Sequence, residues 1–337
     1  IAPPLLKSKF DRNYLSKIDY KFLIDLRETH MLFRQMQYLV ALSIEGHFGR
    51  AAERCHVSQP SLSSAIKQME HVLGVPIVMR GRRFIGFTPE GKRVVEWAKK
   101  VTAQRDAMMI ELSQMKENLA GRIRIGAMPN SSPILPLFSR ILTERYPSVE
   151  IDIQFLGVEE TRMGLANFSL DVGVTYINEE SLDDLNSLPV YTESLSLLVP
   201  EDSVWAKKTS ITWKEAAFLP LCLLDKGMHE RRIVDETFAK VGCTPDVVVM
   251  ADSILNLIFH VMSAGLVTIV PSHFAKVPGS LPGTRAIELL TPKISREVGL
   301  IWSPNEPMMP MAKMMVGIAK ELQSTAELEQ RIGREAA

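Results

Sequence analysis

A short run of polar side chains between positions 58 and 63 has the residue types that read the edges of DNA bases. Ser58 is a good helix N-cap, and Pro60 suits the first turn of the helix that follows. Gln59, Ser61 and Ser63 would then lie near the start of that helix. A Gln side chain can pair with adenine through two hydrogen bonds, and hydroxyls can bond bases or phosphates. An ordinary helical hairpin with a Ser-rich cap is the alternative interpretation.

A basic turn lies shortly after this helix. Two short extended runs, Val75–Met79 and Phe84–Phe87, flank the sequence RGRR and predict a small β-hairpin. From Met31 to Arg93 the chain carries nine basic and four acidic residues, a net charge of +5, although the whole chain is neutral. A basic module on an otherwise acidic chain favours binding to a polyanion such as nucleic acid.

A second group of polar residues, Met128–Ser132, lies between a predicted strand end and a predicted helix start. Backbone N–H groups and hydroxyls at such a junction can hold a small anion. An ordinary N-cap explains the same residues equally well.

No catalytic, metal-binding or cofactor motif emerges from the sequence. It contains no GxSxG, P-loop or GxGxxG motif, and the string that starts at His229 and Glu230 lacks the second histidine of HExxH because Ile233 occupies that position. His47, His56 and His71 fall in the basic module, where a surface or phosphate-contact role is favoured over metal ligation. The sequence therefore predicts a protein that is not an enzyme and has no cofactor.

The three cysteines, Cys55, Cys222 and Cys243, are far apart and lack CxxC spacing, so the sequence indicates neither a disulfide framework nor a zinc site. They are expected to be small buried hydrophobes. One alternative stays open: a reversible disulfide between Cys222 and Cys243 would make a redox sensor. The apolar surroundings of Cys222, in LPLCLLD, favour burial and inertness instead.

The elements that position the polar groups near residue 58 are three short helices. Apolar residues at helical spacing predict helices over Arg34–Glu45, Phe48–Cys55 and Ser58–Leu73, with Gly46 and Gly74 as ends. The second of these helices would cross the DNA backbone and the third would enter the major groove.

A long helix is predicted from Thr88 to Ala120. Its apolar residues recur at alternating steps of four and three, which is a heptad stripe broken only at Arg105. A core helix shows the same pattern, but the length favours a coiled-coil dimer seam. The expected seam residues are Val101, Met108, Leu112 and Met115.

After Gly121 strands and helices alternate. The strands Arg122–Ala127, Val149–Phe155 and Leu170–Tyr176, with helices over Ile134–Arg145 and Glu159–Phe168, predict a βαβαβ unit with a parallel sheet. A second unit is expected from the strands Leu195–Val199, Leu221–Leu224, Val247–Met250 and Leu266–Val270, with helices Arg231–Val241 and Ile254–Ala264. A later strand, Val298–Trp302, and a helix, Ala312–Leu322, can return to the first lobe. Two such lobes leave a cleft between them.

Length and composition agree with this organisation. The 337 residues suffice for two or three folding units, and 46% hydrophobic with 23% charged residues is typical of globular proteins. Apolar runs are too short for a membrane helix, and the first 30 residues lack the apolar core of a secretory signal. A cytoplasmic location is expected.

The segment from Phe33 to Gly91, FRQMQYLVALSIEGHFGRAAERCHVSQPSLSSAIKQMEHVLGVPIVMRGRRFIGFTPEG, resembles the DNA-binding domain of LysR-type transcriptional regulators almost end to end. The rest follows that family in its order of elements, including the GRIRIGAM opening of the second domain. Carried over by residue, base contacts fall on Gln59, Pro60 and Ser63, and phosphate contacts of the wing on Arg82 and Arg83. The full expected DNA-binding set is Gln59, Pro60, Ser61, Ser63, Ser64, Lys67, Arg82 and Arg83. The sequence departs from the family at Ser64, where Arg or Lys is common, and at Cys55, where Leu is usual.

The resemblance implies an α/β protein with an N-terminal winged helix-turn-helix and a two-lobed effector domain similar to periplasmic binding proteins. The expected boundaries are an extension over 1–30, a DNA-binding domain over 31–88, a linker helix over 89–120 and an effector domain over 121–337. The implied partners are promoter DNA with paired half-sites, a small and anionic effector, and further copies of the chain in a homotetramer. The effector would lie at the strand–helix junction, in contact with Met128, Pro129, Asn130, Ser131 and Ser132. The order of strands and helices, rather than the resemblance, places Thr175 of the first lobe and Lys226, Asp252, Ser253 and Thr268 of the second lobe opposite this junction.

Overall fold

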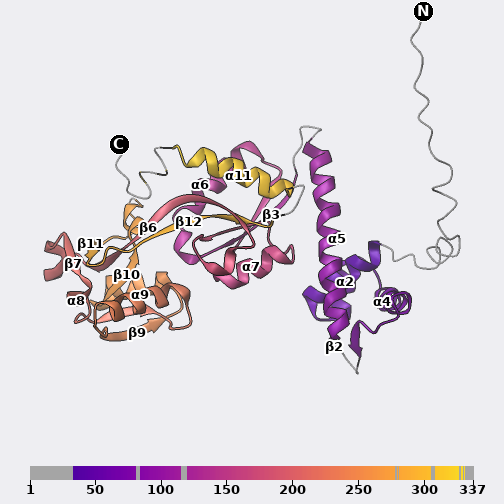
Figure 1. The fold of residues 1–337 in the computed structure, drawn as a ribbon, viewed down its shortest axis with the longest axis horizontal. Coiled ribbons are helices and arrows are strands. Elements are labelled where there is room, and N and C mark those ends of the chain that lie inside the picture. Colours follow the sequence, from indigo (N-terminus) through magenta and orange to yellow (C-terminus); the bar gives the residue numbers. More distant parts are fainter. Residues whose placement is uncertain are drawn as a thin grey trace, which may run out of the picture. The chain divides into compact units, whose positions relative to one another are not determined.

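The computed structural model describes residues 33–80, 84–114, 120–277, 279, 281–304, 308–325, 328 and 330. The chain forms two compact units, Ile1–Arg105 and Asp106–Ala337 (Figure 1). The predicted extension over 1–30 lies outside the described residues.

The first unit is a three-helix core with a β-hairpin. Its helices are α2 (Phe33–Glu45), α3 (Phe48–Arg54) and α4 (Gln59–Leu73). Leu39, Leu42, Leu62, Ile66 and Met69 are fully buried between them. The helical spacing of these apolar residues is therefore the reason that the three helices form one core.

The turns between the helices depend on caps. Ser58 Oγ accepts a hydrogen bond from Ser61 N at the start of α4, and Gly74 ends that helix in the left-handed conformation with φ 68°. At the start of α3, His47 Nδ1 accepts from Gly49 N at 3.0 Å and from Arg50 N at 3.4 Å. The imidazole can accept these bonds only when Nδ1 carries no proton.

Because His47 caps α3, its replacement by alanine should destabilise the first unit by about 1 kcal/mol, the usual cost of a lost N-cap. His47→Asn should retain most of the stability, since an Asn side chain accepts the same bonds. Thermal unfolding of the three proteins at pH 8 provides the measurement. Equal melting temperatures for wild type and His47→Ala would show that the cap contributes nothing.

The hairpin consists of β1 (Val78–Arg80) and β2 (Phe84–Phe87), which pair antiparallel. The first strand starts at Val78 rather than at the expected Val75, because Gly74 and Pro76 occupy the bend that leaves α4. The Glu70 carboxylate accepts from Ile77 N and Val78 N at 2.9 and 3.0 Å, and so fixes where the strand begins. The long helix α5 spans Pro89–Gln114. Residues 115–119 of its predicted range lie outside the described residues, and Ala120 is not helical.

The first lobe of the second unit is a sheet covered on both faces. Strand β3 (Gly121–Ala127) lies between β4 (Val149–Phe155) and β5 (Val172–Tyr176), all parallel, as the βαβαβ pattern predicts. Helices α6 (Leu135–Arg145) and α11 (Pro310–Leu322) cover one face, and α7 (Val158–Ala166) covers the other (Figure 1).

One strand passes through both lobes. Strand β6 spans Asn186–Pro200 and pairs antiparallel with β12 (Ser295–Trp302) as far as Ser194. From Leu195 onward it pairs with β10 (Val267–Pro271) of the second lobe. The expected strand Leu195–Val199 covers only the second half of β6. The sequence did not predict the first half, from Asn186 to Ser194, as a strand.

The second lobe has its own sheet and core. Strands β10, β8 (Leu221–Leu224) and β9 (Val247–Ala251) are parallel, and β11 (Thr284–Leu290) pairs with β6 on the other side. Helices α9 (His229–Lys240) and α10 (Ile254–Ala264) pack on opposite faces. The sequence did not predict β7 (Ser210–Thr212), α8 (Trp213–Ala216) or β11.

The predicted architecture, a helix-turn-helix module before a two-lobed α/β domain, is confirmed. The domain boundaries at 30, 88 and 120 stay predictions. Among the described residues, no helix combines the length and apolar character needed to cross a membrane.

Candidate nucleic-acid interface and effector cleft

The predicted DNA-contact residues of α4 lie on its solvent side. Gln59, Pro60, Ser61, Ser64 and Lys67 are exposed and Ser63 is half-buried, whereas Leu62, Ile66 and Met69 face the core. Ser61 Oγ lies 2.8 Å from Ser58 Oγ, so part of its bonding capacity serves the cap. Contact with DNA stays a prediction for these residues, and Arg82 and Arg83 lie outside the described residues.

Part of the positive charge counted from the sequence is neutralised within the module. Glu45 accepts from Arg54 Nη1 at 2.9 Å and lies 3.6 Å from Arg50 Nε. These two arginines therefore help to hold α2 and α3 together. The net charge of +5 therefore includes arginines whose charge is already paired with Glu45 and is not fully available to bind phosphates.

The apolar stripe of α5 divides into two parts. Ala98, near its start, packs into the core of the first unit. Val101, Met108 and Leu112, by contrast, are 38%, 51% and 48% exposed. Exposed apolar residues at this spacing suit a partner helix. Met115 lies outside the described residues.

The junction after β3 forms a short 3₁₀ turn, Pro129–Ser131. Ser131 Oγ and N both donate to Met128 O, at 2.7 and 3.0 Å, and Ser132 Oγ and N both donate to Pro129 O, at 2.6 and 3.1 Å. The turn thus consumes the hydroxyl and N–H donors that were expected to hold an anion. An anion could accept hydrogen bonds from these groups only if their bonds to Met128 O and Pro129 O were broken.

A cleft of about 1040 Å³ lies beside this turn and takes residues from both lobes. Of the predicted effector residues, Met128, Pro129, Thr175 and Asp252 line it. Lys226 and Ser253 are exposed and Thr268 is buried, with its hydroxyl donated to Cys222 O at 2.6 Å; none of the three lines this cleft.

Asn130 and Ser131 are buried behind the cleft, and Ser132 is half-buried. Asn130 lines a smaller chamber of about 20 Å³ together with Tyr176 and Glu230.

Several lining residues were missed at the start of α9. His229, Glu230 and Arg232 lie on the helix that follows strand β8 after residues 225–228, and they line the cleft from the second lobe. The rule that ligands bind beyond the carboxyl ends of parallel strands, applied to β8, could have found them. The string that starts at His229 is not a zinc motif, because it lacks the second histidine. Its first two residues, His229 and Glu230, line the cleft.

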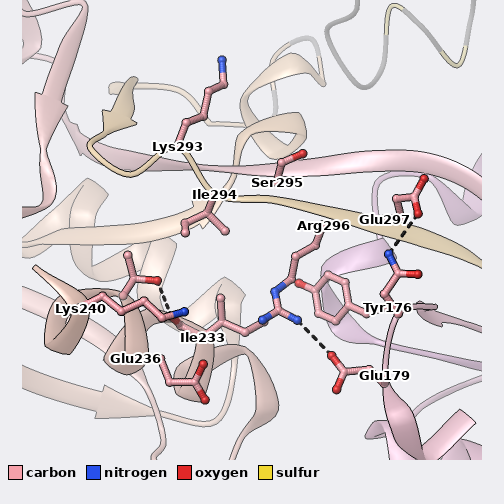
Figure 2. Close-up of a pocket in the computed structure, with 12 residues that line it drawn as sticks. Tyr176, Glu179, Ile233, Glu236, Lys240, Lys293, Ile294, Ser295, Arg296 and Glu297 are labelled. Carbon is pink, nitrogen blue, oxygen red and sulfur yellow. Dashed lines mark hydrogen bonds and ion pairs between the residues drawn. The ribbon is translucent and has the colours of Figure 1, made fainter.

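Glu179 of the first lobe lies beside Arg296 on β12 and beside His229 on α9 of the second lobe. Arg296 Nη1 lies 3.0 Å from Glu179 Oε1, and the same oxygen lies 3.3 Å from His229 Nε2. The Arg296 guanidinium also lies over the Tyr176 ring, 5.6 Å from its centre. Figure 2 shows the Arg296 guanidinium next to the Tyr176 ring and paired with Glu179; all three residues line a second pocket of about 480 Å³ that also takes residues from α9 and β12.

Carboxylates outnumber cations around the cleft. The acidic lining residues are Glu159, Glu160, Glu179, Glu180, Glu230, Glu236 and Asp252. The basic or imidazole groups are His229, Arg232 and Arg296. Among the residues that the structure describes, no group of three or more His, Cys, Asp or Glu side chains could hold a metal ion.

A buried polar cluster lies beneath the cleft. Tyr176 Oη and Asn130 Nδ2 both donate to Glu193 Oε1, at 2.5 and 3.1 Å. Burial raises the pKa of Glu193 to about 7, although the two hydrogen bonds oppose that shift. His273 Nε2 lies 2.8 Å from Asn130 O and so ties the second lobe to the first; burial lowers the pKa of His273 to about 4.

A helix-turn-helix module followed by a two-lobed α/β domain is the architecture of a DNA-binding regulator with a ligand-binding domain. The family model for the bacterial regulatory helix-turn-helix protein, lysR family, matches residues 33–92, and that for the LysR substrate binding domain matches residues 116–324. The chain belongs to the LysR family of transcriptional regulators.

Among its relatives is the DNA-binding transcriptional dual regulator OxyR of Escherichia coli K12, 28% identical over 82% of this chain and 91% of that protein. The structure of a full-length OxyR variant from Pseudomonas aeruginosa is 29% identical, with a TM-score of 0.69 over 88% of this chain and 99% of that one. A structure of CbnR with its target DNA, 19% identical, shares the fold with a TM-score of 0.63 over 86% of this chain and 99% of that one.

Proposed function

We propose that this LysR-family DNA-binding regulator is controlled by a small molecule that binds in the cleft between the two lobes. The carrying observation is that the cleft takes its walls from both lobes, with Met128 and Thr175 on one side and His229 and Asp252 on the other. A ligand that touches both lobes binds one arrangement of them better than another, which is the requirement for control by ligand.

The effector class that we infer is a small monoanion. Its acidic group would bind at the first turn of α9, where the N–H groups of the helix start and the Arg232 guanidinium supply positive charge. The seven carboxylates around the cleft would repel a ligand with several negative charges. Hydroxyl or amino groups elsewhere on the ligand would suit these carboxylates.

Replacing Arg232 by alanine should weaken the effector response roughly tenfold, since a coupling of 1–3 kcal/mol is typical between a ligand and a conformational change. Footprint titrations with acetate, glycolate and lactate on a target promoter measure the response. Arg285→Ala is the matched control, because Arg285 is exposed on the same lobe and does not line the cleft. If both variants respond like wild type, the acidic group does not bind at α9.

The assembly that we propose is a homotetramer, a dimer of dimers that binds paired DNA half-sites in the cytoplasm. The exposed residues Val101, Met108 and Leu112 of α5 support the first dimer contact. Dimer symmetry would be mirrored by two half-sites in the promoter.

A cysteine-based redox sensor is the second candidate, because several relatives at 26–28% identity are named hydrogen peroxide-inducible genes activators. The thiols of this chain offer limited support. Cys222 is buried and burial raises its pKa to about 11, so little of it is the reactive thiolate. Cys243 is half-buried beside a different core cluster, and no cysteine among the described residues lines the cleft.

A titration of free thiols before and after peroxide separates the two candidates. Loss of two thiols together with a changed footprint would favour the redox sensor. Unchanged thiols with a footprint that responds to a small anion would favour the cleft.

A further inference from the structure

The buried carboxyl group of Glu193 lies where the chain passes from one lobe to the other. On strand β6, Glu193 is opposite Arg296 of β12, and Leu195 is already opposite Pro271 of β10. Any rotation of the lobes relative to each other must bend β6 near this point. A charge at this position is therefore coupled to the angle between the lobes.

The contacts of Glu193 leave one oxygen without a partner. Oε1 accepts from Tyr176 and Asn130, whereas Oε2 is buried and has no hydrogen-bond partner among the described residues. An ionised carboxylate with a bare buried oxygen is costly, and a neutral acid is much less so. The two protonation states thus prefer different surroundings: the neutral form fits this closed packing, and the ionised form favours an arrangement that admits water.

The groups that face Glu193 come from five elements. They are Tyr176 on β5, Tyr191 on β6 itself, Arg296 on β12, His229 and Glu230 on α9, and His273 in the 3₁₀ turn after β10. Burial raises the pKa of both tyrosines well above 10 and lowers that of His273 to about 4, so these three stay neutral from pH 5.5 to 8. Glu230 disfavours the ionised form of Glu193 and Arg296 favours it.

We propose that this regulator also senses protons: loss of the Glu193 proton opens the joint between the lobes, and this opening changes how the assembled protein contacts DNA. The proton is a ligand in addition to the molecule in the cleft. Only the charge of one carboxyl group changes, and the released proton goes to solvent. The response therefore exists in the absence of any effector.

The proton on Glu193 should make the free energy of unfolding depend on pH. Because burial raises the pKa of Glu193 from 4.5 to about 7, the folded state holds a proton that the unfolded state has lost between these values. The contribution of Glu193 is therefore most favourable below pH 4.5 and is lost as the pH rises toward 7. Glu193→Gln mimics the neutral form at every pH.

The full-length Glu193→Gln protein should melt at the wild-type temperature near pH 4.5 and about 3 °C or more above it at pH 8. Glu201→Gln makes the same change at an exposed carboxyl of the second lobe and should show no such pH dependence. A difference between wild type and Glu193→Gln that is constant with pH would overturn the assignment.

Footprints at pH 6 and pH 8, without effector, test the consequence for DNA. The wild-type protein should give one footprint at pH 6 and a different footprint at pH 8. Glu193→Gln should give the pH 6 footprint at both pH values. His229→Gln should change its footprint with pH as the wild type does. A pH response kept by Glu193→Gln and lost by His229→Gln would assign proton sensing to the imidazole and reject our proposal.

If the Glu193→Gln variant does not fold, nuclear magnetic resonance of the wild-type protein can test the proposal instead. With ¹³C-labelled glutamate, one carboxyl resonance should titrate near pH 7 in the folded protein. If every glutamate titrates below pH 5.5, the proposal is wrong.

Discussion

Replacement of Gln59 by alanine should weaken binding to the cognate promoter by about 1–3 kcal/mol, the usual value of one two-bond base contact. The side chain is exposed at the first position of α4, where a helix in the major groove presents its reading residues. Binding to unrelated DNA should be unchanged, because no phosphate contact is lost. Titrations on promoter and scrambled DNA at one salt concentration measure both affinities.

Lys67 provides the contrasting variant, because it is exposed further along the same helix. Lys67→Ala should weaken binding to both DNAs equally and reduce the salt slope by about 1, as expected for a phosphate contact. An equal loss on both DNAs for Gln59→Ala would assign Gln59 to the backbone and not to the bases.

Replacement of Leu112 by aspartate should raise the dimer dissociation constant by a factor on the order of 100, which corresponds to about 3 kcal/mol. Leu112 is half-exposed in the single chain and lies one helical turn from Met108, so a partner helix would bury both. A carboxylate placed in that seam has no partner to compensate its loss of hydration, and such burial costs several kcal/mol. Sedimentation velocity over a concentration series measures the shift.

Two variants test whether the effect belongs to the seam. Leu112→Met keeps an apolar side chain and should remain dimeric. Gln104→Asp places the same charge at an exposed position of α5 outside the apolar stripe, and should also remain dimeric. A Leu112→Asp protein that sediments like wild type would remove this part of α5 from the interface.

Local patterns were enough for most of the fold. Leu62, Ile66 and Met69 recur at helical spacing and are buried as that spacing requires, and the caps at Ser58 and Gly74 mark where α4 begins and ends. The parallel order of β3, β4 and β5 followed from strand–helix alternation, since such connections must cross over the sheet. Each of these signals acts within a short stretch of chain.

Strand β6 shows where this reasoning stops. Its first half pairs with β12, which is far away in the sequence, so its length depends on a partner that no local pattern reveals. The same limit applies to β11, which lies between two strands distant in the chain.

By itself, the sequence determined the two kinds of domain, the helix that presents Gln59 to solvent, and the apolar stripe of α5, because each depends on the periodicity of one segment. Only the tertiary structure decided the composition of the cleft. It satisfied the donors of Ser131 and Ser132 within their own turn, and it brought His229 and Arg296 to Glu179. It also buried Glu193 at the joint of the lobes, since burial and pairing between distant segments are set by packing and not by neighbours in sequence.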